Sequence, residues 1–292
     1  MMEGMNDVSD GMPAGSQGHA EVAAASLGIA VAQFAPGADP EVNLRAMRSL
    51  AQTAAARGAR LVVFPEYSSY FAEPLGTELL KHAQRLDGAF VTGLAEIACA
   101  LHVHIVAGVV EQSDDPHRVH NTLVALSPQG ELVARYRKQH LYDAFGASES
   151  QWMLPGSLDE PETFEVDGVH VGLQTCYDIR FPEVSRRIAD AGARLILVPA
   201  EWVRGPLKEA HWRTLLAARA LENTVYIAAA DHVPPTGVGL SVIIDPMGVE
   251  LAALGETTDA AVAWVSNRRV DEVRRVNPSL ALRRYRVVPT GE

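Results

Sequence analysis

Apolar positions along the chain follow two patterns, which alternate. Short apolar runs over 27–34 and 60–65 predict buried strands, whereas 39–57 has its apolar positions at helical spacing. Asp39 and Pro40 are typical of the N-cap and the first turn of such a helix. The same criteria predict a helix over 77–101 and strands over 103–111, 121–126 and 131–137. This order indicates a sheet with helices packed against it.

The second half of the chain repeats the pattern of the first. The segment 57–66 (RGARLVVFPE) is echoed at 191–200 (AGARLILVPA). Weaker echoes relate 103–108 to 225–230, 127–130 to 245–248 and 29–33 to 170–174. Because all the echoes keep the same order, we predict an α/β fold of two similar halves. Two sheets would pack face to face with helices outside them, as a four-layer α-β-β-α sandwich built by internal duplication.

Composition narrows the class of protein. With 48% hydrophobic and 21% charged residues, the 292-residue chain is typical of a soluble globular protein. Its formal net charge of −11 argues against a nucleic-acid partner and against an anionic membrane surface. No apolar run approaches the roughly 18 residues of a membrane span. Residues 1–20 lack the basic start and apolar core of a secretion signal, so we expect a disordered N-terminal tail over 1–26 and a cytoplasmic protein.

Cys176 is the first candidate for chemistry. It ends an apolar strand and precedes a polar turn, and the carboxyl ends of strands are where open α/β sheets bind ligands. Glu66 and Lys138 also follow predicted strands. The duplication separates these residues from the scaffold, because the second half has Ala200 in place of Glu66 and neither Cys176 nor Lys138 is repeated. We therefore expect one site per chain.

Each of these three residues has an ordinary structural explanation by itself, as a buried thiol, a solvated carboxylate or a basic surface residue. Together they suit acyl transfer, in which a base takes the thiol proton, the thiolate attacks an acyl carbon and a cation stabilises the oxyanion. His140 and His211 are alternative partners for the thiol, but a structural polar contact is the commoner use of a single His. The spacing of Cys and His residues gives no zinc site and no disulfide framework, and no phosphate-binding glycine motif is present.

In their sequence context these residues resemble the nitrilase superfamily of carbon–nitrogen hydrolases. The resemblance rests on VFPE ending at Glu66, RKQHLYD around Lys138, ES at Glu149 and TCYDIRFPE around Cys176. It implies an α-β-β-α sandwich that needs no metal or organic cofactor. It also implies that Cys176 is the nucleophile and Glu66 its general base. Lys138 and the backbone N–H of Tyr177 would hold the oxyanion, while Glu149 would orient the lysine and help to position the substrate.

Within the superfamily, the motifs around Lys138 and Glu149 are most similar to the Nit-type branch, which includes ω-amidases and deaminated-glutathione amidases. The resemblance implies hydrolysis of a small linear carboxamide to a carboxylic acid and ammonia through a Cys thioester. An N-carbamoyl amino acid or β-ureido acid is the alternative substrate. A catalytically silent binding module is the alternative of another class, but such a module has no need of all four motif residues.

The segments that flank the motifs supply candidate pocket residues: Asp143, Trp152, Glu201, Trp202 and Arg204. Arg204 would pair with a substrate carboxylate if it faces the pocket. Glu201 departs from the family pattern, in which many relatives have a small or amide residue, and it would attract an amine or repel an acid.

The resemblance covers 27–267, which we expect to form one carbon–nitrogen hydrolase domain. The remaining segment, 268–292, is rich in arginine and shows little periodicity. The resemblance implies that this segment is a C-terminal tail at the interface of a homodimer or higher homo-oligomer.

Overall fold

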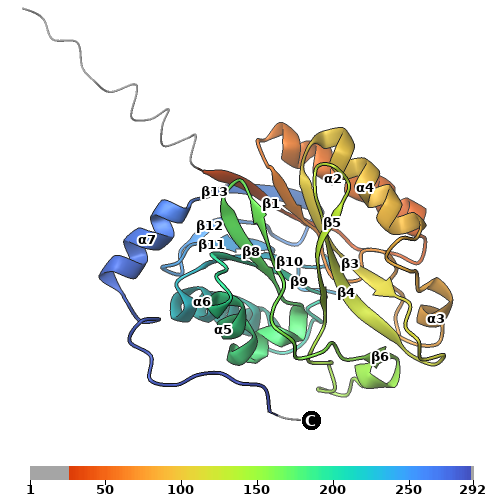
Figure 1. The fold of residues 1–292 in the computed structure, drawn as a ribbon. Helices are drawn as coiled ribbons and strands as arrows, with labels where there is room; N and C mark the ends of the chain where they lie inside the picture. Colours follow the sequence, from red (N-terminus) through yellow and green to blue (C-terminus); the bar gives the residue numbers. More distant parts are fainter. Residues whose placement is uncertain (1–25, 291–292) are drawn as a thin grey trace, which may run out of the picture.

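Two β-sheets packed face to face form the centre of the structure, and helices cover both outer faces (Figure 1). The computed structural model describes residues 26–290, so the tail expected over 1–26 lies outside the described residues except for its last position. The α-β-β-α sandwich predicted from the sequence is confirmed.

The first sheet has the strand order β13-β1-β2-β3-β4-β5, with β6 paired to β4. Its strands are β1 (Leu27–Gln33), β2 (Leu61–Val63), β3 (His104–Glu111), β4 (Val119–Leu126), β5 (Leu132–Arg137), β6 (Met153–Leu154) and β13 (Asp259–Val265). The second sheet has the order β12-β11-β10-β9-β8-β7. Its strands are β7 (Thr163–Val166), β8 (Val169–Leu173), β9 (Leu195–Pro199), β10 (Tyr226–Ala230), β11 (Val242–Ile244) and β12 (Glu250–Ala253).

Both sheets have the same internal plan. In the first, β1, β2 and β3 run parallel and lead into antiparallel β4 and β5. In the second, β8, β9 and β10 run parallel and lead into antiparallel β11 and β12. Each sheet also has one antiparallel strand at its other edge, β13 beside β1 and β7 beside β8. The internal duplication read from the sequence is therefore a duplication of strand order and direction.

Alternating side chains along the central strands fill different layers. Ile29 and Val31 of β1 belong to the core between the sheets, whereas Ala30 and Ala32 face the helices on the outer side. Helices α2 (Pro40–Ala56) and α4 (Ala89–Leu101) cover the first sheet, and α5 (Pro182–Asp190) and α6 (Lys208–Asn223) cover the second. Asp39 caps α2 as predicted. No helix within residues 26–290 combines the length and the apolar character needed to cross a membrane.

The helix predicted over 77–101 is wrong in its extent, because it is two helices, α3 (Glu78–His82) and α4. Between them the backbone N–H of Gln84 donates to the carbonyl of Val110 at 3.0 Å, which brings the chain beside β3. The Gln84 side chain then accepts from the backbone N–H of Phe90 at 3.0 Å in the first turn of α4. The backbone at Gln84 thus pairs with a neighbouring strand, a contact that helical periodicity does not reveal.

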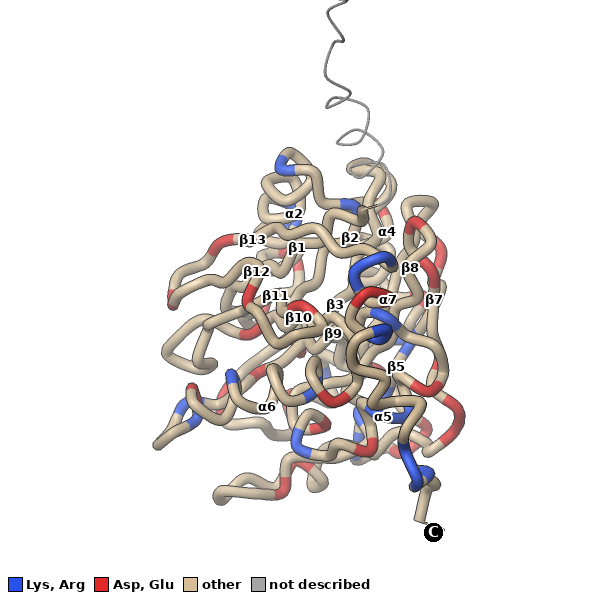
Figure 2. The backbone as a smooth tube through the Cα atoms, turned by 90° about the vertical axis from the view of Figure 1, so that its left-hand side faces the viewer, with Lys and Arg blue, Asp and Glu red and all other residues tan. Residues whose placement is uncertain are grey.

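The segment expected to be a tail from 268 onward begins as a helix, α7 (Asn267–Val276). Ser266 caps it, and Val270 and Val273 are buried, with Val270 in the core between the sheets. This pair at helical spacing is the apolar signal hidden among the charged residues of α7, where two pairs of arginines flank Asp271 and Glu272 (Figure 2). Residues 277–290 then run without regular structure past α5, where Arg283 forms an ion pair with Asp190.

Candidate active site

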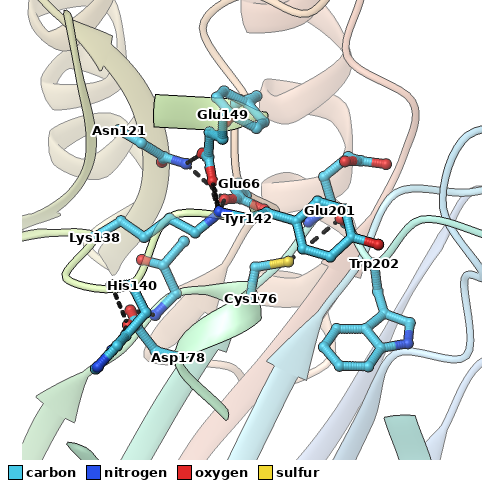
Figure 3. Close-up of polar contacts among 12 residues, drawn as sticks. Glu66, Asn121, Lys138, His140, Tyr142, Glu149, Cys176, Asp178, Glu201 and Trp202 are labelled. Atoms are coloured by element: carbon cyan, nitrogen blue, oxygen red, sulfur yellow. Dashed lines mark hydrogen bonds and ion pairs between the residues drawn. The ribbon is translucent and has the colours of Figure 1, made fainter. Parts of the chain in front are cut away.

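Four of the residues singled out in the sequence line one cavity of about 500 Å³: Glu66, Lys138, Glu149 and Cys176. They come from separate segments of the fold (Figure 3). Glu66 follows β2 and Lys138 follows β5, while Glu149 and Cys176 begin the short 3-10 helices η1 (Glu149–Gln151) and η2 (Cys176–Arg180). The duplicated sheets therefore bring together side chains that lie more than a hundred positions apart.

The Glu66 carboxylate is buried and held on both of its oxygens. Oε1 accepts from Lys138 Nζ at 2.9 Å and from Asn121 Nδ2 at 2.6 Å, and Oε2 accepts from the backbone N–H of Glu201 at 2.6 Å. Burial raises the pKa of Glu66, and the attraction of Lys138 opposes that rise without cancelling it. Glu66 is therefore a carboxylate that accepts a proton more readily than an ordinary glutamate.

The backbone of Glu66 is fixed from two sides. His232 Nε2 lies 2.7 Å from the Glu66 carbonyl oxygen, to which the neutral ring donates its proton. Gly108 on β3 lies against the Cα atom of Glu66, where a Cβ on residue 108 would come within 2.6 Å. Tyr67, the next residue, has a φ of 56°, in the left-handed region that costs energy for residues other than glycine. These contacts hold the turn after β2 in one conformation.

Glu149 shares the Lys138 ammonium with Glu66 but has more hydrogen-bond donors. It accepts from Lys138 at 2.8 Å, from the Tyr67 hydroxyl at 2.6 Å, from the backbone N–H of Tyr142 at 2.6 Å and from Asn121 Nδ2 at 3.2 Å. Burial by itself would raise the pKa of Glu149, but Lys138 and these hydrogen bonds outweigh it and lower the pKa. Of the two carboxylates, Glu66 is thus the one that takes up a proton first.

Lys138 is buried between the two carboxylates. Burial by itself would lower the pKa of its ammonium, but Glu149 and Glu66 outweigh that effect and raise the pKa well above its usual value. Lys138 therefore stays protonated and supplies a fixed positive charge at the bottom of the cavity.

Cys176 has a φ of 44° at the sharp turn where β8 leads into η2, so its backbone is in a conformation rare for a non-glycine residue. Its Sγ donates to the carbonyl oxygen of Glu201 at 3.3 Å. Burial raises the pKa of the thiol well above its usual value, and the nearby Glu66 carboxylate adds to that rise. The sulfur is accordingly a thiol at neutral pH and needs a base before it can attack.

The peptide backbone of Glu201 links the thiol to the carboxylate, because its N–H donates to Glu66 and its C=O accepts from Cys176. The next residue, Trp202, donates its backbone N–H to the buried Asp231 at 2.7 Å. The Glu201 side chain lines the cavity, and burial, with a further contribution from Glu66, raises its pKa well above its usual value. Glu201 is thus less acidic than the sequence alone would indicate.

The remaining predicted pocket residues divide into two groups. Trp152, Trp202 and Tyr177 line the cavity, with Tyr177 packed edge-on against Tyr142. Asp143 and Arg204 are not among its lining residues. Asp143 accepts from the backbone N–H of Ser150 at 3.0 Å and so supports the Glu149 turn. Arg204 is partly exposed and faces Glu256, 3.5 Å away, so the expected partner for a substrate carboxylate lies elsewhere.

Two cations that sequence reasoning missed line the cavity instead, Lys208 and Arg180. Lys208 Nζ donates to the Tyr142 hydroxyl at 2.8 Å and lies 4.3 Å from the centre of the Phe145 ring. The Arg180 guanidinium lies 4.7 Å from the centre of the Trp202 ring. Within the described part of the chain, neither cation has a carboxylate within ion-pair distance. Burial and the neighbouring Arg180 lower the pKa of Lys208.

The two candidate histidines make polar contacts beside the site. His140 Nδ1 lies 2.8 Å from Asp178, and its ring stacks on Phe181. His211 Nδ1 lies 3.4 Å from Arg180. Neither ring is among the residues that line the cavity. Both contacts match the structural use of a single His that the sequence favoured.

The model of the carbon-nitrogen hydrolase family matches residues 28–275. The chain belongs to the carbon–nitrogen hydrolase family. It is 41% identical over 263 residues to a deaminated glutathione amidase of Escherichia coli O157:H7, an alignment covering 88% of this chain and 97% of the relative. It is 31% identical over 255 residues to an omega-amidase of Mus musculus, an alignment covering 83% of this chain and 89% of the relative.

A solved structure supports the same assignment. The NitFhit protein of C. elegans superposes with a TM-score of 0.84 at 28% sequence identity, covering 90% of this chain and 67% of that one. The family member described here is therefore a hydrolase acting on carbon–nitrogen bonds other than peptide bonds, and an amidohydrolase of the Nit type.

Proposed function

We propose that this amidohydrolase cleaves the ω-amide of a small linear acid, releasing a carboxylic acid and ammonia through a thioester on Cys176. The observation that carries the proposal is the cavity shared by Cys176, Glu66 and Lys138, in which the backbone of one residue, Glu201, forms hydrogen bonds with both the thiol and the carboxylate. A thiol with a raised pKa needs a base beside it, and Glu66 is a carboxylate with a raised pKa.

The first half of the reaction forms the thioester. Glu66 takes the thiol proton as Cys176 Sγ attacks the amide carbon, and the carbonyl oxygen becomes an oxyanion. Lys138, with the backbone N–H of Tyr177, stabilises that charge. The tetrahedral intermediate then collapses: the C–N bond breaks, and the nitrogen takes the proton held by Glu66 and leaves as ammonia.

The second half returns the enzyme to its starting state. Glu66, again ionised, takes a proton from a water molecule that attacks the thioester carbon. The C–S bond breaks, the acid is released and the proton returns to the sulfur. Glu149 supports both halves by holding the Lys138 ammonium in place. No metal or organic cofactor enters this scheme.

We infer the substrate class from Lys208 and Arg180, the two cavity cations that have no ion-pair partner in residues 26–290. Lys208 and Arg180 line the same cavity as Cys176 and stand ready to bind a carboxylate at the far end of a short acyl chain. An ω-amide of a dicarboxylic acid has that carboxylate. The E. coli relative is named for deaminated glutathione and the mouse relative for omega-amides, which supports an acidic amide as the substrate. An N-carbamoyl amino acid also has a carboxylate and is the second candidate.

We also propose that the protein is a cytoplasmic homodimer with 277–290 at the interface. The support is the row of apolar side chains that this segment leaves exposed, among them Leu282, Tyr285 and Val288. Light scattering of the full chain and of a chain ending at Val276 tests this proposal. We expect a dimer that weakens or separates on truncation, and a monomer for the full chain would contradict it.

An ammonia-release screen tests the proposed reaction. The panel contains ω-amides of dicarboxylic acids, deaminated glutathione, N-carbamoyl amino acids, neutral aliphatic amides and nitriles, with carboxylate product measured alongside ammonia. We expect turnover of an acidic amide that Cys176→Ala abolishes and the matched Cys99→Ala leaves unchanged. Turnover that survives in a folded Cys176→Ala protein would overturn the thioester route. No turnover of any member of the panel would favour the silent binding module.

A further inference from the structure

Asp178, two residues after Cys176, is a buried carboxylate with no place in the scheme above. None of its surface is exposed, and it accepts four hydrogen bonds. Oδ2 accepts from the Tyr136 hydroxyl at 2.8 Å and from the backbone N–H of Thr175 at 3.2 Å. Oδ1 accepts from the backbone N–H of His140 at 2.9 Å and lies 2.8 Å from its ring Nδ1. Figure 3 shows this contact with His140 beside the Cys176 turn.

The donors come from two segments that carry the chemistry. Tyr136 and His140 lie two positions before and two positions after Lys138, at the end of β5 in the first sheet. Thr175 immediately precedes Cys176 at the end of β8 in the second sheet. The bonds to Tyr136 and His140 hold the backbone on both sides of Lys138, which fixes the point from which the Lys138 side chain starts. Asp178 thus connects the backbone that carries the ammonium to the backbone that carries the thiol.

We propose that Asp178 is a positioning residue, which sets the placement of the Cys176 sulfur relative to the Lys138 ammonium. This inference rests on the proposed function of those two residues. A misplacement of about 1 Å in a catalytic group can cost on the order of a hundredfold in rate. The four hydrogen bonds to Asp178 therefore act on the step that needs the thiol and the ammonium together, whereas Lys208 lies on α6 and binds the substrate carboxylate apart from them.

Asp245 provides a matched control. It has 4% of its surface exposed and also accepts four hydrogen bonds, from the backbone N–H groups of Met247 and Val249 and from the Arg269 guanidinium. It lies in the turn between β11 and β12 and is not a lining residue of the cavity. Asp178→Asn and Asp245→Asn each turn one acceptor oxygen into a donor, so both lower stability, but only the first affects the site.

The test combines kinetics with alkylation. For Asp178→Asn we expect kcat to fall about tenfold to a hundredfold with KM within about threefold of wild type. Asp245→Asn should keep both values. Iodoacetamide labelling of Cys176, followed by peptide mass spectrometry across pH, is the second readout and needs no turnover. Because Lys138 favours the thiolate, we expect labelling of Asp178→Asn to be about threefold to tenfold slower near neutral pH, with the profile moved to higher pH.

Tyr136→Phe removes a single donor and serves if Asp178→Asn fails to fold. We expect it to change kcat and labelling in the same direction by a smaller factor, and to add nothing further in the Asp178→Asn background. The proposal would be overturned if these variants keep the wild-type kcat and labelling profile and only melt at a lower temperature, as Asp245→Asn is expected to do. If no amide is turned over, the labelling profile decides the role of Asp178 separately from the proposed reaction.

Discussion

Lys138 Nζ lies 2.9 Å from Oε1 of Glu66, and neither side chain has more than 2% of its surface exposed. The same ammonium serves the Glu149 carboxylate at 2.8 Å. One positive charge is therefore shared between two buried negative charges. Under the proposed scheme, the stability and the activity of the protein depend on the same three side chains.

Replacing Lys138 by Met should destabilise the fold strongly at neutral pH. Removing one partner of a buried ion pair typically costs about 3–5 kcal/mol, and here two carboxylates lose their cation. Without it the pKa of Glu66 rises further and the pKa of Glu149 is no longer held down, so near neutral pH the folded state binds more protons than the unfolded state. The loss should therefore shrink as the pH falls through the range in which they protonate.

Urea unfolding of Lys138→Met at pH 7 and pH 5 checks this prediction. Lys208→Met is the control, because that change removes a cation with no paired carboxylate in residues 26–290. We expect Lys208→Met to lower the free energy of unfolding less at pH 7 and to show no comparable recovery at pH 5. Equal losses for the two variants at both pH values would contradict the prediction.

The acid limb of the activity profile should report on Glu66. Its pKa is raised above 4.5 by burial, and the Glu149 charge adds to that rise, so protonation removes the base at a higher pH than for an ordinary glutamate. Glu149→Gln removes this repulsion. We expect its kcat to fall, because Lys138 is less well held, while the acid limb of kcat/KM moves to lower pH. A limb that moved to higher pH would show that Glu149 does not repel the charge on the base.

His232 should make the fold sensitive to acid. Burial lowers its pKa from 6.5 to about 4, so the unfolded chain binds a proton on this ring more readily than the folded protein does. Above pH 6.5 the ring is neutral in both states, and the free energy of unfolding is unaffected by it. As the pH falls towards 4, the unfolded chain takes up the proton first, and the free energy of unfolding drops by about 3 kcal/mol in total. Unfolding of His232→Gln should lack this part of the pH dependence. His117→Gln, at an exposed position after β3, should behave as wild type.

Lys208 should govern the preference for acidic substrates. Replacing it by Met removes a charged hydrogen-bond donor from the cavity, which typically costs about 10- to 100-fold in kcat/KM for a substrate that pairs with it. We expect this loss for a carboxylate-bearing ω-amide and little change for a neutral aliphatic amide of similar length. Arg204→Met, outside the cavity, is the matched control. An equal loss on acidic and neutral amides would argue against a carboxylate at Lys208.

Local patterns predicted much of the fold and the residues at the ends of its strands. The echo of 57–66 at 191–200 gave the two halves, because the same strand and turn are needed twice when two sheets of one plan are stacked. Cys176, Glu66 and Lys138, which line one cavity, were singled out because the other half of the chain does not repeat them. The break in the helix at Gln84 was missed, since it depends on pairing with β3, far along the chain.

The cavity wall was harder to predict from sequence. Lys208 and Arg180 become neighbours only when α6 and η2 pack together, and nothing in the spacing of Arg204 distinguished it from them. Asn121 and Tyr67, which hold the two carboxylates, read in the sequence as ordinary polar residues of a strand and a turn. Their role depends on the partner that folding supplies.

The hydrogen bond from the Cys176 thiol to the Glu201 carbonyl affects how readily peroxide oxidises the sulfur. Peroxides convert thiolates to sulfenic acids far faster than they attack thiols. Since the resting sulfur keeps its proton, it offers oxidants little to react with. In the proposed scheme the thiolate forms only when Glu66 takes that proton during turnover, so damage by peroxide should accumulate in working enzyme rather than in idle enzyme.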